Sequence, residues 1–90
     1  MKELKETVNL MESGDYKERF IAEYAQLKIR TLKLLKTVKS YYNDGVKPKL
    51  DCPIGLLLNQ LNAMGTYLDT LRERATIEEI ELPEVNIDEQ

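Results

Sequence analysis

The middle of the chain carries a run of basic side chains with no acid among them, since no Asp or Glu lies between Glu23 and Asp44. The basic residues are Lys28, Arg30, Lys33, Lys36 and Lys39. Such a run can bind an anion, for example the phosphates of a nucleotide or of a nucleic acid backbone. It can equally be a solvated helix face that pairs with acids elsewhere, because residues three apart spiral around a helix. Both interpretations stay open.

A second cluster with binding chemistry lies at Tyr16, Lys17 and Arg19, directly after a predicted helix cap at Asp15. A helix N-terminus attracts anions through its free amide groups and its dipole. A tyrosine ring can also stack on a nucleobase. Together with Lys28, the cluster supplies the candidate ligand-binding residues. The alternative is that Tyr16 only packs against the core.

Residue patterns of catalysis and metal binding are missing from the sequence. It contains no histidine, which excludes His-based acid–base chemistry and the usual zinc sites. No P-loop, G-x-G-x-x-G, nucleophile elbow or H-E-x-x-H pattern occurs. Cys52 is the single cysteine and has neither a disulfide partner nor a histidine base. We therefore expect a protein that is not an enzyme and needs no metal or cofactor.

Charge is distributed unevenly along the 90 residues, whose net charge is −3. Residues 28–49 contain seven Lys/Arg and one Asp, a balance of +6, whereas residues 50–90 contain two Arg and nine acids, a balance of −7. The acidic total argues against nucleic acid as a partner. The chain has no apolar run near the roughly 20 residues that cross a bilayer, and its N-terminus lacks the apolar core of a signal peptide. These features predict a cytoplasmic protein without a membrane partner.

Apolar residues repeat along residues 15–43 at alternating steps of three and four, which predicts a long amphipathic helix. Asp15, followed by Glu18, is typical of an N-terminal cap, and no Gly or Pro follows until Gly45. A second apolar row lies beside the first and makes the stripe wider than one helix can cover. This row consists of Ile21, Ala25, Leu32, Leu35 and Tyr42.

The same periodicity over residues 53–77 predicts a second helix that begins at Pro53, capped by Cys52 or Asp51. Gly65 in its interior costs about 1 kcal/mol relative to Ala. We expect it to mark the close approach of another backbone, although a ligand contact is an alternative. Two long helices joined by a short loop predict an all-α fold, an antiparallel hairpin.

The two ends of the chain are expected to contribute less to the folded core than the two long helices do. Residues 1–14 predict an arm or a short helix. Residues 79–90 are acidic and predict a flexible tail, with a strand-like arm added to a partner as the alternative. The hairpin of residues 15–78 then carries more apolar surface than its two helices can bury. We therefore expect copies of the chain to assemble into a symmetric helical bundle.

Three stretches resemble a family of small helical-hairpin proteins from phages and prophages of Firmicutes. They are DYKERFIAEYAQLKIRTLKL (15–34), CPIGLLLNQLNAMGTYLDTLRERA (52–75) and IEEIEL (77–82). The layout is also distantly similar to that of the phage anti-CBASS sponges. That resemblance implies a hexamer that sequesters cyclic oligonucleotide messengers between protomers. A tyrosine near the N-terminus and basic residues of the long helix would line the pocket.

The resemblance gives each candidate residue a role. Tyr16 would stack on a base, and Lys17, Arg19 and Lys28 would contact phosphates. The function expected is a phage-encoded, non-enzymatic sponge for a cyclic di- or trinucleotide in the host cytoplasm. The alternative is an adaptor or inhibitor whose apolar helix face binds a host protein.

Overall fold

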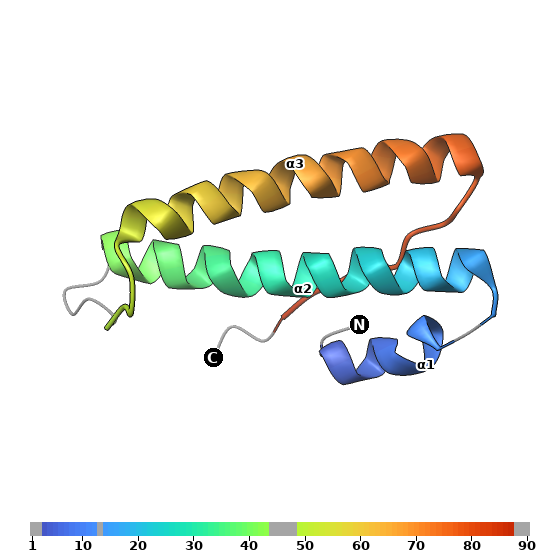
Figure 1. The fold of residues 1–90 in the computed structure, drawn as a ribbon, viewed down its shortest axis with the longest axis horizontal. Coiled ribbons are helices and arrows are strands. Elements are labelled where there is room, and N and C mark those ends of the chain that lie inside the picture. Colours follow the sequence, from blue (N-terminus) through green and yellow to red (C-terminus); the bar gives the residue numbers. More distant parts are fainter. Residues whose placement is uncertain (1–2, 13, 44–48, 88–90) are drawn as a thin grey trace.

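The computed structural model describes residues 3–12, 14–43 and 49–87, and all regular structure among them is helical. A 3₁₀ turn, η1 (Leu4–Thr7), leads into the short helix α1 (Val8–Met11). Two long helices follow, α2 (Tyr16–Asn43) and α3 (Ile54–Glu78). They lie antiparallel, with α1 folded back against α2 (Figure 1). This confirms the predicted all-α hairpin with a short N-terminal helix. The predicted helix stop at Gly45 lies outside the described residues.

Helix α2 begins where the sequence predicts. The backbone N–H of Lys17 donates a hydrogen bond to Oδ1 of Asp15 at 2.8 Å, so the Asp15 side chain satisfies one of the amide groups that a helix start leaves open. Helix α3 begins one residue later than predicted. Pro53 occupies the N-cap position with φ −60° and ψ 142° and makes no side-chain capping bond. A capping role for Cys52 or Asp51 is therefore wrong.

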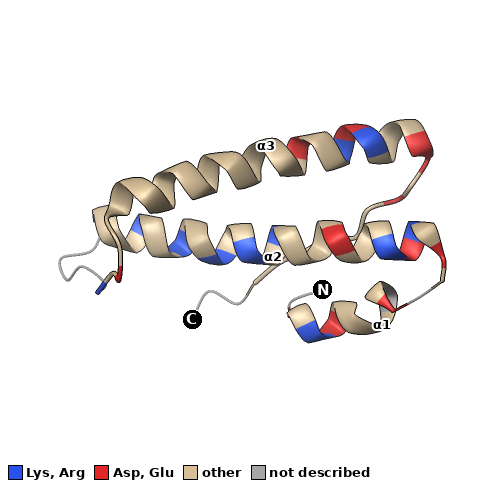
Figure 2. Cartoon of the chain, viewed as in Figure 1, with Lys and Arg blue, Asp and Glu red and all other residues tan. Residues whose placement is uncertain are grey.

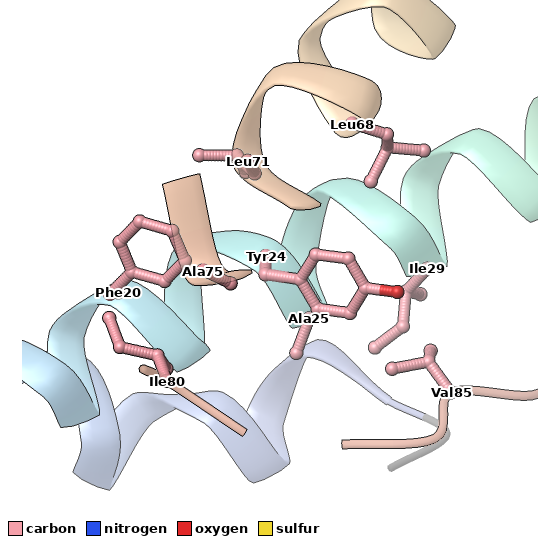
Figure 3. Packing of buried hydrophobic residues seen from close by; sticks show 9 residues of the cluster. All are labelled: Phe20, Tyr24, Ala25, Ile29, Leu68, Leu71, Ala75, Ile80 and Val85. Atoms are coloured by element: carbon pink, nitrogen blue, oxygen red, sulfur yellow. The ribbon is translucent and has the colours of Figure 1, made fainter. Parts of the chain in front are cut away.

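The core lies toward the end of the hairpin where α2 begins and α3 ends. Phe20, Tyr24 and Ile29 of α2 are buried against α3 and the segment that follows it (Figure 3). The other members of this cluster are Ala25, Leu68, Leu71, Ala75, Ile80 and Val85. On another flank of α2, Nε2 of Gln26 donates to the Thr7 hydroxyl at 2.8 Å. Helix α2 is thus covered by three different segments of the chain.

The segment after α3 is not the flexible tail that the sequence predicts. Residues 79–87 run back along α2 (Figure 1), and Ile80 and Val85 belong to the buried core. Leu82 and Ile87 are partly buried against the same cluster. The segment carries three Glu, but its four aliphatic side chains outnumber them and cover part of the second apolar row of α2. Their burial stabilises this path. Residues 88–90 lie outside the described residues.

A specific cap turns the chain at the end of α3. Glu79 adopts the left-handed conformation with φ 57° and ψ 45°. The N–H of Ile80 donates to the carbonyl oxygen of Ala75 at 2.9 Å. This six-to-one bond, with Ile80 and Ala75 in the same apolar cluster, is a Schellman motif. The motif aims Ile80 into the core.

The half of the hairpin nearer to residues 44–48 is less completely covered. Val38 is the one apolar side chain buried in the described part of α2 beyond Thr31, whereas Tyr42 is 55% and Leu56 57% exposed. Gly65 has open space at its Cβ position, with nothing within 4 Å. The close backbone approach expected there does not occur within the chain.

Burial of Ile80 can be tested against a neighbouring residue of the same type. Ile80 is 7% exposed and Ile77 is 81% exposed. We expect Ile80→Ala to lower the free energy of unfolding by about 2–5 kcal/mol, because it leaves a cavity in the core. Ile77→Ala should change it by less than about 0.5 kcal/mol. Urea denaturation followed by circular dichroism measures both, and equal effects would contradict a docked segment.

The left-handed conformation of Glu79 predicts that a substitution at this position can stabilise the fold. A residue with a Cβ pays about 1–2 kcal/mol for this conformation, whereas Gly adopts it at no steric cost. Glu79→Gly should therefore raise the free energy of unfolding by about 1 kcal/mol. Glu81→Gly, at an exposed position two residues later, serves as the control and should bring no gain. A loss of stability in Glu79→Gly would rule out the Schellman cap.

Candidate functional site

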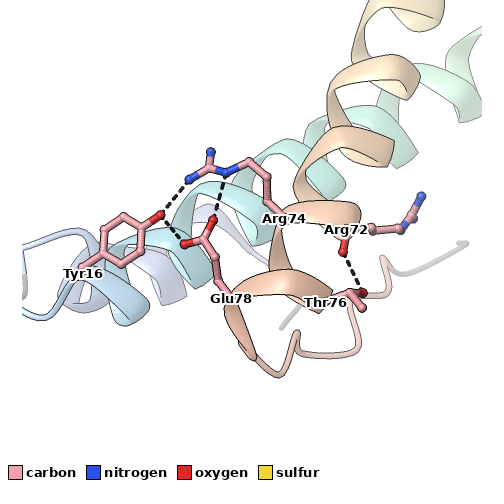
Figure 4. Close-up of polar contacts among 5 residues, drawn as sticks. All are labelled: Tyr16, Arg72, Arg74, Thr76 and Glu78. Carbon is pink, nitrogen blue, oxygen red and sulfur yellow. Dashed lines mark hydrogen bonds and ion pairs between the residues drawn. The ribbon is translucent and has the colours of Figure 1, made fainter.

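A polar cluster joins the start of α2 to the end of α3. The Tyr16 hydroxyl donates a hydrogen bond to Oε1 of Glu78 at 2.7 Å, and Nη2 of Arg74 donates to the same hydroxyl oxygen at 2.7 Å. Nε of Arg74 also pairs with Oε2 of Glu78 at 3.2 Å. Figure 4 shows the closed triangle that these three side chains form. The predicted stacking residue is thus held by two partners from α3.

The aromatic ring of Tyr16 stays accessible beside this triangle, with the residue 47% exposed. Its ring meets the Phe20 ring edge to face, with centroids 6.3 Å apart. The guanidinium carbon of Arg74 lies 4.9 Å from the centroid of Phe20, within the range of a cation–π contact. Tyr16 therefore packs against the core residue Phe20, as one of the two alternatives predicts, while about half of the residue remains exposed.

The triangle shifts the pKa values of its members in the directions that keep it intact. The hydrogen bond to Glu78, helped by desolvation, raises the pKa of Tyr16 above 10.0. The hydrogen bond from Tyr16, helped by Arg74, lowers the pKa of Glu78 below 4.5. The positive charge of Lys17 also contributes to lowering the pKa of Glu78. Lys17 and Arg19 themselves are exposed in the first turn of α2.

Lys28 lies apart from the other three predicted residues. It is twelve positions after Tyr16, which is about 18 Å along a helix. Its pKa is lowered from 10.5, first by partial burial and then by the positive charge of Arg72. Arg72 and Arg74 extend from opposite sides of α3 (Figure 4). Within one chain, Lys28 and Tyr16 are thus well separated along α2.

Sequence analysis did not identify Arg72 as a candidate site residue. Its charge acts on Lys28 of α2, and this effect depends on how α2 and α3 pack together. Its Nη1 pairs with Oδ1 of Asp69 at 3.2 Å, and its carbonyl oxygen accepts a hydrogen bond from Thr76 at 3.1 Å. A second cation next to a half-buried lysine is unfavourable unless an anion balances it. Arg74 and Glu78 were missed for the same reason, although their spacing of four is a visible signal for a helix ion pair.

The basic run of α2 has no acidic counterpart on α3. The first charged residue of α3 is Asp69, so the part of α3 opposite the run carries no charge (Figure 2). Within the described parts of the chain, Arg30, Lys33 and Lys39 have no acidic partner. Among the described acids of the second helix and the tail, the predicted ion pairs are thus missing for these three, and Asp88 and Glu89 of the tail lie outside the described residues.

Other kinds of site find no support among the residues that the structure describes. They include no group of three or more Cys, Asp or Glu side chains arranged to hold a metal ion. None of the described helices has the length and apolar character needed to cross a membrane.

The triangle of Tyr16, Arg74 and Glu78 predicts that the stability of the fold depends on pH, with a loss in acid and a second loss in alkali. Because the folded pKa of Glu78 is lowered, its stabilisation is present above pH 4.5 and is lost as the pH falls through the folded value. Because the folded pKa of Tyr16 is raised, its stabilisation is present below pH 10.0 and is lost as the pH rises through the folded value. Glu78→Gln should lower the melting temperature most between these limits.

Thermal unfolding of both proteins from pH 3 to pH 11 measures this difference. Glu73→Gln, at an exposed position of the same helix, is the control and should leave the curve unchanged. A difference between Glu78→Gln and the parent protein that persists unchanged at pH 3 would contradict the ionised triangle.

Comparison with protein families places these features in context. The family model described as Sequestin matches residues 14–77, a stretch that includes all of α2, all of α3 except its last residue, Glu78, and all four candidate ligand residues. The short N-terminal helix and the docked C-terminal segment lie outside the match. Comparisons with curated proteins and with solved structures gave no match. The family name indicates a sequestering role, and because the match spans well over half of the chain, this protein belongs to the Sequestin family.

Proposed function

We propose that this protein is a non-enzymatic sponge that sequesters an anionic cyclic nucleotide in pockets between copies of itself. The observation that carries the proposal is Lys28, a partly buried cation of α2 whose pKa is lowered first by that burial and then by the positive charge of Arg72 on α3. The membership of the Sequestin family supports a sequestering role. A phage origin, expected from the resemblance of residues 15–34 and 52–82, fits a protein that removes a defence signal in the host cytoplasm.

The pair of cations is suited to a phosphate. Partial burial of Lys28 removes water that would otherwise solvate its charge, and Arg72 adds a repulsive charge beside it. A phosphodiester placed near both would neutralise the Lys28 charge and share the Arg72 guanidinium with Asp69, forming charge-assisted hydrogen bonds. The guanidinium group of Arg72 offers planar, bidentate contacts, whereas Lys28 acts as a point charge.

Tyr16 supplies the second element of a nucleotide site, an accessible ring on which a base can stack. It lies about 18 Å from Lys28 along α2. One compact ligand can therefore contact both residues only if they come from different copies of the chain. Lys17 and Arg19, exposed beside Tyr16, add positive charge near the phosphates of such a ligand.

Assembly is favoured by the apolar surface that the hairpin leaves uncovered. Tyr42 and Leu56 are more than half exposed at the less covered end. Gly65 offers open space on α3, so the backbone of a neighbouring copy could approach closely there. Closed symmetry is the default for such self-association.

The same uncovered surface supports a rival function, an adaptor or inhibitor that binds a helix of a host protein. The two functions differ in oligomeric state. Size-exclusion chromatography with light scattering should give a stable multiple of the 10.5 kDa chain mass for the sponge. A monomer would favour the adaptor.

Isothermal titration calorimetry with cyclic di- and trinucleotides tests the site. We expect Lys28→Ala and Arg72→Ala each to weaken binding at least about tenfold, as loss of a charged hydrogen bond of 1.5–3 kcal/mol requires. Tyr16→Leu should weaken it similarly, whereas Tyr16→Phe keeps the ring and should retain binding.

Lys33→Ala removes a charge from an exposed position of the same helix and is the matched control. Light scattering should show the parent assembly for all variants. Absence of heat at tens of micromolar for every cyclic nucleotide would refute the sponge, and equal affinities of Lys28→Ala and Lys33→Ala would refute the pocket.

A further inference from the structure

The segment that docks on α2, residues 80–87, is joined to α3 through one residue in an unfavourable conformation. Glu79 is the single residue with a positive φ in the described parts of the chain, and a residue with a Cβ atom adopts the left-handed region at a cost. Ile80, the next residue, already belongs to the buried core. The direction of the docked segment therefore depends on Glu79, which is its hinge.

Burial of apolar side chains holds the docked segment in place. Ile80 and Val85 are buried, and Leu82 and Ile87 are partly buried against the same cluster. Leu82, Val85 and Ile87 make no backbone hydrogen bond with any other residue that the structure describes. Their attachment is thus the removal of apolar surface from water, which does not depend on which chain supplies them.

The surface under the docked segment needs a cover of this kind. It includes Ala25, from the second apolar row of α2, and Ile29, both at 0% exposure. Ile21 and Leu32 of the same helix are partly buried against the cluster. If the segment leaves, these side chains meet water, which is unfavourable. The same segment of a second copy has the same side chains and restores the contacts.

Exchange of the segment between two copies changes the structure mainly at the hinge. The hydrogen bond from the N–H of Ile80 to the carbonyl oxygen of Ala75 is lost, while both copies of Glu79 leave the left-handed region. Swapping an identical element is a low-cost route to a dimer, and a short hinge under strain promotes it. Eight residues reach about 26 Å when extended, which exceeds the 23 and 20 Å widths of the molecule.

We propose that residues 80–87 are exchanged between two copies of this chain, so that the segment of each copy covers α2 of the other. The partner is a second copy, and it contributes Ile80 and Val85 to the core of its neighbour. The contact forms at the end of the hairpin where α2 begins and α3 ends, away from Tyr42 and Leu56. This inference does not depend on the proposed nucleotide site.

NMR of a mixed sample tests the exchange directly. Equal amounts of ¹³C-labelled and unlabelled full chain are unfolded together in urea and refolded, and isotope-filtered NOEs then separate contacts between chains from contacts within one chain. Figure 3 shows Val85 close to Ile29. We expect NOEs between the methyl groups of Val85 in one chain and Ile29 in the other. An assembly in which all these NOEs stay within one chain would overturn the proposal, as would a monomer.

Substitutions at the hinge test its role in the exchange. Glu79→Gly removes the cost of the left-handed conformation from the closed chain, so the dissociation constant of the exchanged pair should rise at least about tenfold. Glu79→Val should lower it, because a β-branched residue is a genuine outlier at positive φ. The interchain share of the NOE between Val85 and Ile29, followed over a dilution series, measures both constants.

Glu81 provides the matched controls, since it is exposed and lies two residues beyond the hinge. Glu81→Gly and Glu81→Val should leave the dissociation constant within about twofold of the parent value. Circular dichroism should show the parent helix content for every variant. If Glu79→Val does not fold, Glu79→Gly decides the outcome. A constant for Glu79→Gly equal to that of Glu81→Gly, or below that of the parent, would overturn the exchange.

Discussion

The apolar surface of α2 is wider than one partner helix can cover, and the rest of the structure follows from how that surface is buried. Helix α3 covers the row that contains Phe20 and Tyr24. The second row would face water in a bare hairpin. The N-terminal turn and the segment after α3 cover it at one end, where Ile29 becomes fully buried. The N-terminal turn and residues 79–87 are therefore structural parts of the core.

This arrangement divides the hairpin into two unlike halves. At one end, four segments meet around a dry cluster, and the triangle of Tyr16, Arg74 and Glu78 ties the helix ends together. Toward the other end, the described residues of α2 and α3 are less covered, and Tyr42 and Leu56 are more than half exposed. The basic run of α2 lies in this second half, opposite an uncharged stretch of α3 (Figure 2). Binding partners are favoured where the chain leaves both apolar surface and charge unmatched.

In the proposed function, the separation of Tyr16 from Lys28 would link binding to assembly. Each residue has features suited to a nucleotide: an accessible ring in one case and a partly buried cation beside Arg72 in the other. Their distance along α2 means that a compact ligand touching both needs two copies of the chain. A sequestering protein of this design would gain affinity from assembly without any catalytic group.

The sequence by itself determined the two long helices, the cap at Asp15 and the excess apolar row of α2. These depend on local periodicity and on side chains near in the chain. Only the tertiary structure decided that residues 79–87 dock and that Glu79 takes a left-handed conformation. It also decided that Tyr16 meets Arg74 and Glu78, which are 58 and 62 positions away. Such contacts depend on the relative placement of whole helices, and an acidic composition hides the few apolar side chains whose burial fixes the last segment in place.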